Sequence, residues 1–80
     1  MHELGITEQM LTVALEQASK SGIGKITRIN LILGEVSGVS SDSIQLYFDP
    51  LSKGTPAQEA ELCFQPASGR EFYIESIEGE

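Results

Sequence analysis

Hydrophobic residues near the start of the chain recur at intervals of three and four positions, which is the spacing of one face of an amphipathic helix. The predicted helix runs from Ile6 to Ser19. Beyond it, Gly22 can adopt a left-handed conformation and is followed by the apolar Ile23, as at many helix C-termini. We therefore expect the helix to end near Ser21. The residues predicted to face the core are Ile6, Met10, Val13, Ala14 and Ala18.

A strand is predicted from Lys25 to Leu33, where β-branched and aliphatic residues predominate. Alternation places three apolar residues on one of its faces and two on the other, so we expect an interior strand that is buried on much of both faces. The first face carries Ile29, Leu31 and Leu33, and the second carries Ile26 and Ile32.

A second helix is predicted after the segment 34–38, which begins and ends with glycine. Ser40 or Ser41 can cap its N-terminus. Pro50 lacks the amide that would close the last turn, so the helix should loosen or kink there before Gly54 ends it. The residues expected to face inward are Ile44, Tyr47, Phe48 and Leu51.

Two further strands are predicted, from Glu61 to Gln65 and from Arg70 to Glu78. The segment 66–69 between them begins with proline and ends with glycine, which suits a type I turn followed by a left-handed residue, a common closure of a β-hairpin. The element order is therefore helix, strand, helix, strand, strand. This order predicts a small α/β domain of the α+β two-layer type, with both helices on a single face of a three-stranded sheet. Residues 1–80 are expected to form one domain.

The net charge of the chain limits the kinds of partner that it can bind. A formal net charge of -7 repels phosphate backbones and anionic membrane surfaces, so we expect no nucleic acid and no membrane as partners. No basic and apolar leader opens the sequence, and no apolar run approaches the roughly 20 residues that span a bilayer, which favours a cytoplasmic protein. Cys63 is the single cysteine, so neither an intrachain disulfide nor a CxxC zinc site can form.

Five separate segments of the sequence carry a further signal: residues 1–4 (Met-His-Glu-Leu), 25–28 (Lys-Ile-Thr-Arg), 34–39, 53–57 and 69–77. In this order along the chain, they resemble the HypA (HypA/HybF) family of hydrogenase maturation nickel metallochaperones. The resemblance implies that Ni(II) binds at Met1, His2 and Glu3. It also implies a HypB-like GTPase as a partner and the large subunit of nickel–iron hydrogenase as the recipient. The family's zinc module, with two CxxC pairs inserted where residues 65–68 stand, is absent, so no zinc is expected in this chain.

The first residues also offer a nickel site on their own chemistry. The α-amine of Met1, the amide and imidazole of His2, and the amide of Glu3 together supply four nitrogens, which is a set that suits tetragonal Ni(II) or Cu(II). Because the amine and the imidazole must lose protons to bind, the affinity should fall as the pH drops. The same residues have a plainer explanation. A histidine beside the first methionine is often only a solvated side chain, and the Glu3 carboxylate can simply complement a helix start.

Other functions remain to be weighed against nickel carriage. The chief alternative is a metal-free docking module of the maturation machinery, which would keep its partner after His2→Ala. A hydrolase is disfavoured because Cys63 is better explained as a small strand residue, and no base can be paired with it or with a serine. The serines of the central segment suit turns and helix caps; they are Ser37, Ser40, Ser41 and Ser43. The thin core and the short closing turn favour a homodimer formed by segment exchange.

Overall fold

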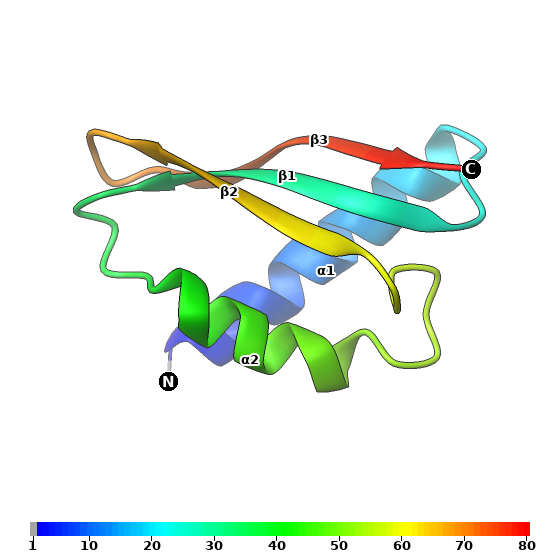
Figure 1. The fold of residues 1–80 in the computed structure, drawn as a ribbon, viewed down its shortest axis with the longest axis horizontal. Coiled ribbons are helices and arrows are strands. Elements are labelled where there is room, and N and C mark those ends of the chain that lie inside the picture. The colour runs from blue at the N-terminus through cyan, green and yellow to red at the C-terminus, as the bar shows by residue number, and fades with distance from the viewer. Residues whose placement is uncertain (1) are drawn as a thin grey trace.

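The computed structural model describes residues 2–80 and, for His2, the backbone alone. The helices are α1 (His2–Lys20) and α2 (Ser41–Leu51), and the strands are β1 (Ile26–Gly34), β2 (Glu61–Ala67) and β3 (Phe72–Gly79). Both helices lie on one face of the three-stranded sheet (Figure 1). The predicted two-layer α+β fold is confirmed.

Helix α1 begins at His2, four residues before the predicted start at Ile6, and ends at Lys20. Its C-terminus has the expected glycine cap. Gly22 has a φ of 73°, and the amide of Ile23 donates to the carbonyl of Ala18 over 2.8 Å. This pairing from C″ back to C3 is the Schellman arrangement, which satisfies a carbonyl that the helix leaves free.

The buried stripe of α1 is turned slightly from the predicted one. Met10, Ala14 and Ala18 are buried as predicted, but Leu11 joins them at 7% exposure whereas Val13 is 44% exposed. The stripe also includes Thr7, which is completely buried. Ile6 is half-buried and packs against the core. The helix thus faces the sheet and α2 along one side and leaves the side that carries Val13 open.

The sheet has the order β2-β1-β3, so the predicted hairpin between the last two strands is wrong. β1 is the central strand, parallel to β2 and antiparallel to β3. The segment between β2 and β3 therefore crosses the end of β1 instead of joining neighbours. Gly69 does not have the predicted left-handed conformation, because the positive φ values among the described residues belong to Gly22, Gly38 and Gly54.

The crossing over the end of β1 depends on the small size of Gly34. Its amide donates to the carbonyl of Glu71 over 2.6 Å, and the amide of Val36 donates to the carbonyl of Gly69 over 2.9 Å. A Cβ on Gly34 would lie 2.7 Å from the carbonyl carbon of Gly69 and 2.9 Å from the amide nitrogen of Glu71, which is closer than real Cβ contacts. The crossing backbone thus occupies the space that any larger residue would need.

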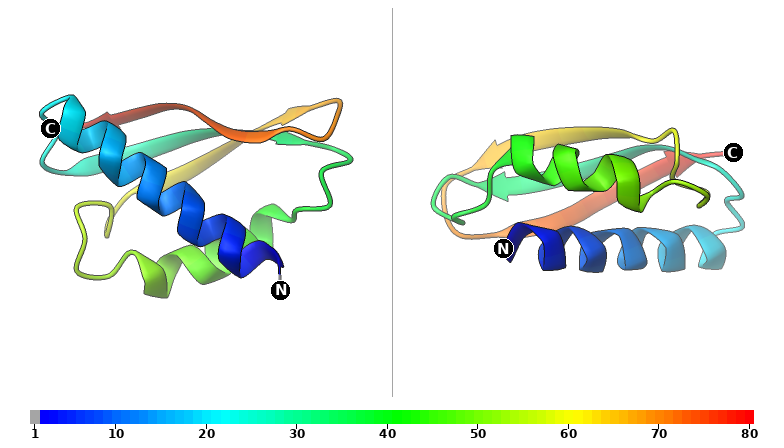
Figure 2. Two further views of the ribbon diagram at one scale, coloured as in Figure 1. Left: turned by 180° about the vertical axis from the view of Figure 1, so that it is seen from behind. Right: turned by 90° about the horizontal axis from the view of Figure 1, so that it is seen from below.

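The faces of β1 differ from the prediction at Ile26. Ile29 and Leu31 are buried against the helices, and Ile26 belongs to the same core instead of the opposite face. The pairing with β3 shifts register between Ile26 and Arg28, and such an irregularity turns the side chain of Ile26 inward. The opposite face of the strand is only partly covered, because no described helix lies over it (Figure 2).

Helix α2 covers the core on the same face of the sheet as α1 (Figure 1). Ser40 is its N-cap, as predicted, and its hydroxyl accepts from the amide of Ser43. Ile44 and Phe48 are buried at 0% and 1% exposure. Pro50 stands in the last turn, and the helix ends one residue later at Leu51. These side chains meet those of β1 and α1 and form a single core.

Candidate metal-binding site

Of the three residues predicted to bind nickel, His2 and Glu3 lie at the start of α1. Met1 and the side chain of His2 lie outside the part of the chain that the structure describes. His2 is the first residue of the helix and Glu3 the second, so these two residues belong to the first helical turn and do not merely precede it. The amides of a first turn have no carbonyl partner within their own helix. The amide nitrogens of His2 and Glu3 are therefore not needed for the helical hydrogen bonds.

Glu3 joins the starts of the two helices. Its carboxylate accepts a hydrogen bond from the amide of Ser40 over 3.3 Å, and Ser40 is the N-cap of α2. Its backbone carbonyl accepts from the hydroxyl of Thr7, one turn further along α1. A carboxylate next to two helix N-termini also interacts favourably with both helix dipoles. The Glu3 side chain thus links the start of α1 to the start of α2 through one exposed hydrogen bond.

Thr7 was not singled out from the sequence, although it is completely buried and fixes the carbonyl of Glu3. A threonine inside a helix commonly bonds back to the carbonyl four residues earlier, and that spacing was the available signal. What the spacing could not show is burial. The buried hydroxyl needs this acceptor, so it holds the first turn of the helix in place.

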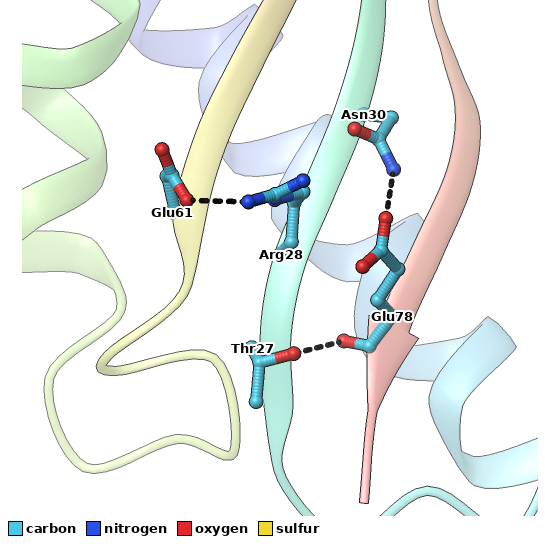
Figure 3. Close-up of polar contacts among 5 residues, drawn as sticks. All are labelled: Thr27, Arg28, Asn30, Glu61 and Glu78. Atoms are coloured by element: carbon cyan, nitrogen blue, oxygen red, sulfur yellow. Dashed lines mark hydrogen bonds and ion pairs between the residues drawn. The ribbon is translucent and has the colours of Figure 1, made fainter.

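On the face of the sheet that the helices do not cover, polar side chains pair with one another. Arg28 pairs with Glu61 over 3.1 Å, and Asn30 donates to the carboxylate of Glu78 over 3.0 Å (Figure 3). The hydrogen bond to Glu61 raises the pKa of Arg28, as the bond to Glu59 raises that of Lys25. Both pairs are exposed and contribute little to stability. Among the residues that the structure describes, no three histidine, cysteine, aspartate or glutamate side chains meet to hold a metal ion.

The cysteine and the serines occupy structural positions. Cys63 lies within β2 and is half-buried. Ser40 caps α2, and the hydroxyl of Ser37 accepts from the amide of Val39 over 3.2 Å. These contacts agree with the predicted turn and capping roles.

Two solved structures share this fold. The solution structure of the Ni metallochaperone HypA from Helicobacter pylori superposes with a TM-score of 0.75 at 16% identity, covering 92% of this chain and 70% of that one. A second, described as the solution structure of HypA protein, superposes with a TM-score of 0.82 at 16% identity, covering 100% of this chain and 97% of that one. At such low identity these superpositions define the class of fold, which is that of HypA proteins.

The sequence comparisons then identify the family. Residues 1–68 match the family described as hydrogenase/urease nickel incorporation, metallochaperone, hypA. A hydrogenase maturation factor HypA from Caldanaerobacter subterraneus is 31% identical over the whole of both chains. The chain therefore belongs to the HypA family, as the resemblance predicted.

Other relatives align with only part of their length. A hydrogenase maturation factor HypA from Dehalococcoides mccartyi is 46% identical over 81% of this chain, and one from Chlorobaculum tepidum is 36% identical over 88% of it. The chain spans 55% and 62% of those two relatives. It thus represents little more than half of the length of these family members.

Within residues 2–80, no helix is both long enough and apolar enough to cross a bilayer.

Proposed function

We propose that this chain is a nickel-carrying domain that holds Ni(II) through Met1, His2 and Glu3 and delivers it during the maturation of nickel–iron hydrogenase. The observation that carries the proposal is the family match, which covers residues 1–68 and so includes all three residues. Nickel is the cargo of the protein and not a resident cofactor. The role assigned to the protein is non-enzymatic and cytoplasmic, with a HypB-like GTPase as partner and the hydrogenase large subunit as recipient.

The helical conformation at the chain start suits the proposed ligands. In a helix, a ψ angle of about −42° keeps consecutive backbone nitrogens on the same side of the residue, whereas about +135° in a strand turns them apart. His2 and Glu3 are both helical, so their nitrogens face the same way. The positive end of the helix dipole opposes a cation there, but amides that lose their protons to the metal supply compensating negative charge. Nitrogen ligands in a tetragonal set are those that Ni(II) prefers.

A domain without the zinc module also fits the comparisons. The alignment with the Caldanaerobacter relative spans 114 positions, whereas this chain has 80 residues, so that relative contains residues without a counterpart here. The family match ends at residue 68, within the segment where the module is expected to be missing. We propose that residues 1–80 form the nickel-binding domain alone, with no zinc site of its own.

Nickel binding should depend on the register of the first residue. Adding three alanines before Met1 converts the α-amine of Met1 into a peptide amide and moves the new amine away from His2. A single added residue would not serve, because a histidine in third place forms a four-nitrogen nickel site of its own with the new amine and two amides. We expect the nickel dissociation constant to rise by about a hundredfold, which corresponds to about 2.8 kcal/mol. The measurement is isothermal titration of nickel into protein freed of its tag so that it begins at Met1, beside the extended variant.

The controls separate binding from folding. Thermal unfolding without metal should be the same for the two proteins, because the addition lies before the helix. His2→Ala should weaken nickel binding as well, through loss of the imidazole. Unchanged nickel affinity in the extended variant contradicts the proposed site, whatever the fate of His2→Ala.

The Glu3 side chain should matter much less than the Glu3 amide. Glu3→Gln keeps the backbone nitrogen and an oxygen that can accept from the amide of Ser40. We expect nickel affinity to change by less than about threefold and stability by less than about 1 kcal/mol, since a single exposed hydrogen bond is at stake. Calorimetry and urea denaturation test the two values. A loss of affinity comparable to that of His2→Ala would instead make the carboxylate a ligand.

A further inference from the structure

A groove of about 430 Å³ lies between the first half of α1 and the start of β3. It exists because α1 crosses the sheet obliquely (Figure 2). The loop after the helix is bonded to the end of β3, since the amide of Gly24 donates to the carbonyl of Glu80 over 2.9 Å. The start of the helix is instead held to α2 through Glu3 and Ser40. The helix therefore diverges from the first residues of β3.

The groove is lined mainly by apolar residues from three segments. Val13, which the helical pattern predicts to be buried, is 44% exposed at this position. Covering exposed apolar surface with a partner is favourable, because the surface is then removed from water. The apolar residues along the groove are Ile6, Met10, Val13, Val39, Phe72 and Ile74.

The charge at the groove is opposite to that of the protein. The protein carries a net charge of -7, yet among the described residues that line the groove Arg70 is the one that is charged, and none of them is acidic. Within residues 2–80, the ion pairs are those of Lys25 with Glu59 and of Arg28 with Glu61, so Arg70 makes none there. A guanidinium presents several donors in a plane that matches a carboxylate. An occupant with a negative group next to its apolar part therefore complements this groove.

We propose that the groove binds a segment of a partner protein in which an aliphatic or aromatic side chain stands next to a carboxylate. Its volume lies within the range of sites that hold small ligands or a few side chains. Ile6 is three to four positions from His2 and Glu3, which places it one helical turn from them on the same side. The occupant would thus lie beside the proposed nickel site. That role in nickel transfer rests on the proposed function, whereas the binding itself requires no nickel.

The test uses the metal-free protein and a short peptide as the probe. N-acetyl-phenylalanyl-leucyl-aspartate amide is titrated into ¹⁵N- and methyl-labelled protein, and NMR shifts are followed. The same peptide with asparagine in place of aspartate serves as the matched probe. The variants are Arg70→Gln and Val13→Asp, with Leu46→Asp as a control because Leu46 is 70% exposed on α2 and does not line the groove.

The expected shifts are confined to Ile6, Val13, Ile74 and the residues around Arg70. Arg70→Gln should raise the dissociation constant of the aspartate peptide about tenfold, to that of the asparagine peptide, because a charge-assisted hydrogen bond is lost. Val13→Asp should weaken both peptides, and Leu46→Asp neither.

Absence of shifts at millimolar peptide, or equal binding of both peptides to the parent and to Arg70→Gln, would overturn the proposal. So would a concentration-dependent dimer that covers the groove and is abolished by Val13→Asp, since the occupant would then be a second copy. Peptide binding by a parent protein that takes up no nickel would retain the groove while rejecting the nickel site. Such a result would favour the metal-free docking module.

Discussion

Replacing Phe48 by alanine should remove a large part of the stability of the protein. Phe48 is 1% exposed and belongs to the core between α2, β1 and α1. Truncating a buried phenylalanine to alanine typically costs about 3 to 5 kcal/mol, because burial is lost and a cavity remains. A domain of 80 residues has a free energy of unfolding of roughly 4 to 12 kcal/mol. Urea denaturation followed by circular dichroism measures the difference.

Leu46 provides the matched control for Phe48, since it lies on the same helix but is 70% exposed. Leu46→Ala should change stability by no more than about 0.5 kcal/mol. If Phe48→Ala had an effect as small as that of Leu46→Ala, α2 would not pack against the sheet in the way described.

Gly34→Ala should be the second most damaging single change, and it tests the order of the strands. A Cβ at this position would meet the backbone of Gly69 and Glu71, neither of which can move without breaking the bonds that carry the segment across β1. Forcing an extra carbon into packed structure costs about 1 to 3 kcal/mol. Thermal or urea denaturation measures the loss. Hydrogen exchange should also become faster at the amides of position 34 and Val36, which donate hydrogen bonds to this segment in the parent protein.

Gly5 is the control, because a Cβ there would meet nothing within 4 Å. Gly5→Ala within α1 should stabilise the protein by up to about 1 kcal/mol, since alanine has the higher helix propensity. Under the hairpin arrangement that the sequence suggested, both alanines would be tolerated. Equal behaviour of the two variants would therefore argue against the crossing.

Local signals predicted the elements well, and the long-range arrangement less well. The glycine cap at Gly22, the serine cap at Ser40 and the inward Ile44 and Phe48 follow from residues within a few positions of one another. The turn between the last strands could not be interpreted in this way. A proline and a glycine favour a change of direction. They do not determine whether β3 pairs with the preceding strand, β2, or with the free edge of β1.

The early start of α1 was missed for a related reason. Gly5 is a poor helix former, so the pattern of residues 2–5 gives little support to a helix. The structure stabilises this turn through contacts that no local pattern shows, from Thr7 to the carbonyl of Glu3 and from the Glu3 carboxylate to Ser40. The proposed nickel ligands themselves were found through the resemblance and through their own chemistry. Their assignment depends on the calorimetric comparison, because the side chain of His2 and all of Met1 lie outside the described residues.

The placement of β1 between β2 and β3 has a consequence for grafting a further unit onto this fold. Ala67 and Phe72 are held by opposite sides of the same strand, so the two chain ends at this opening stand about 10 Å apart, twice the spacing of neighbouring strands. A module inserted between Ala67 and Phe72 would be attached to the sheet at two separate points, on opposite sides of β1, and not through two neighbouring strands. The sheet would then fix the orientation of the module relative to the start of α1 and leave it little freedom to rotate.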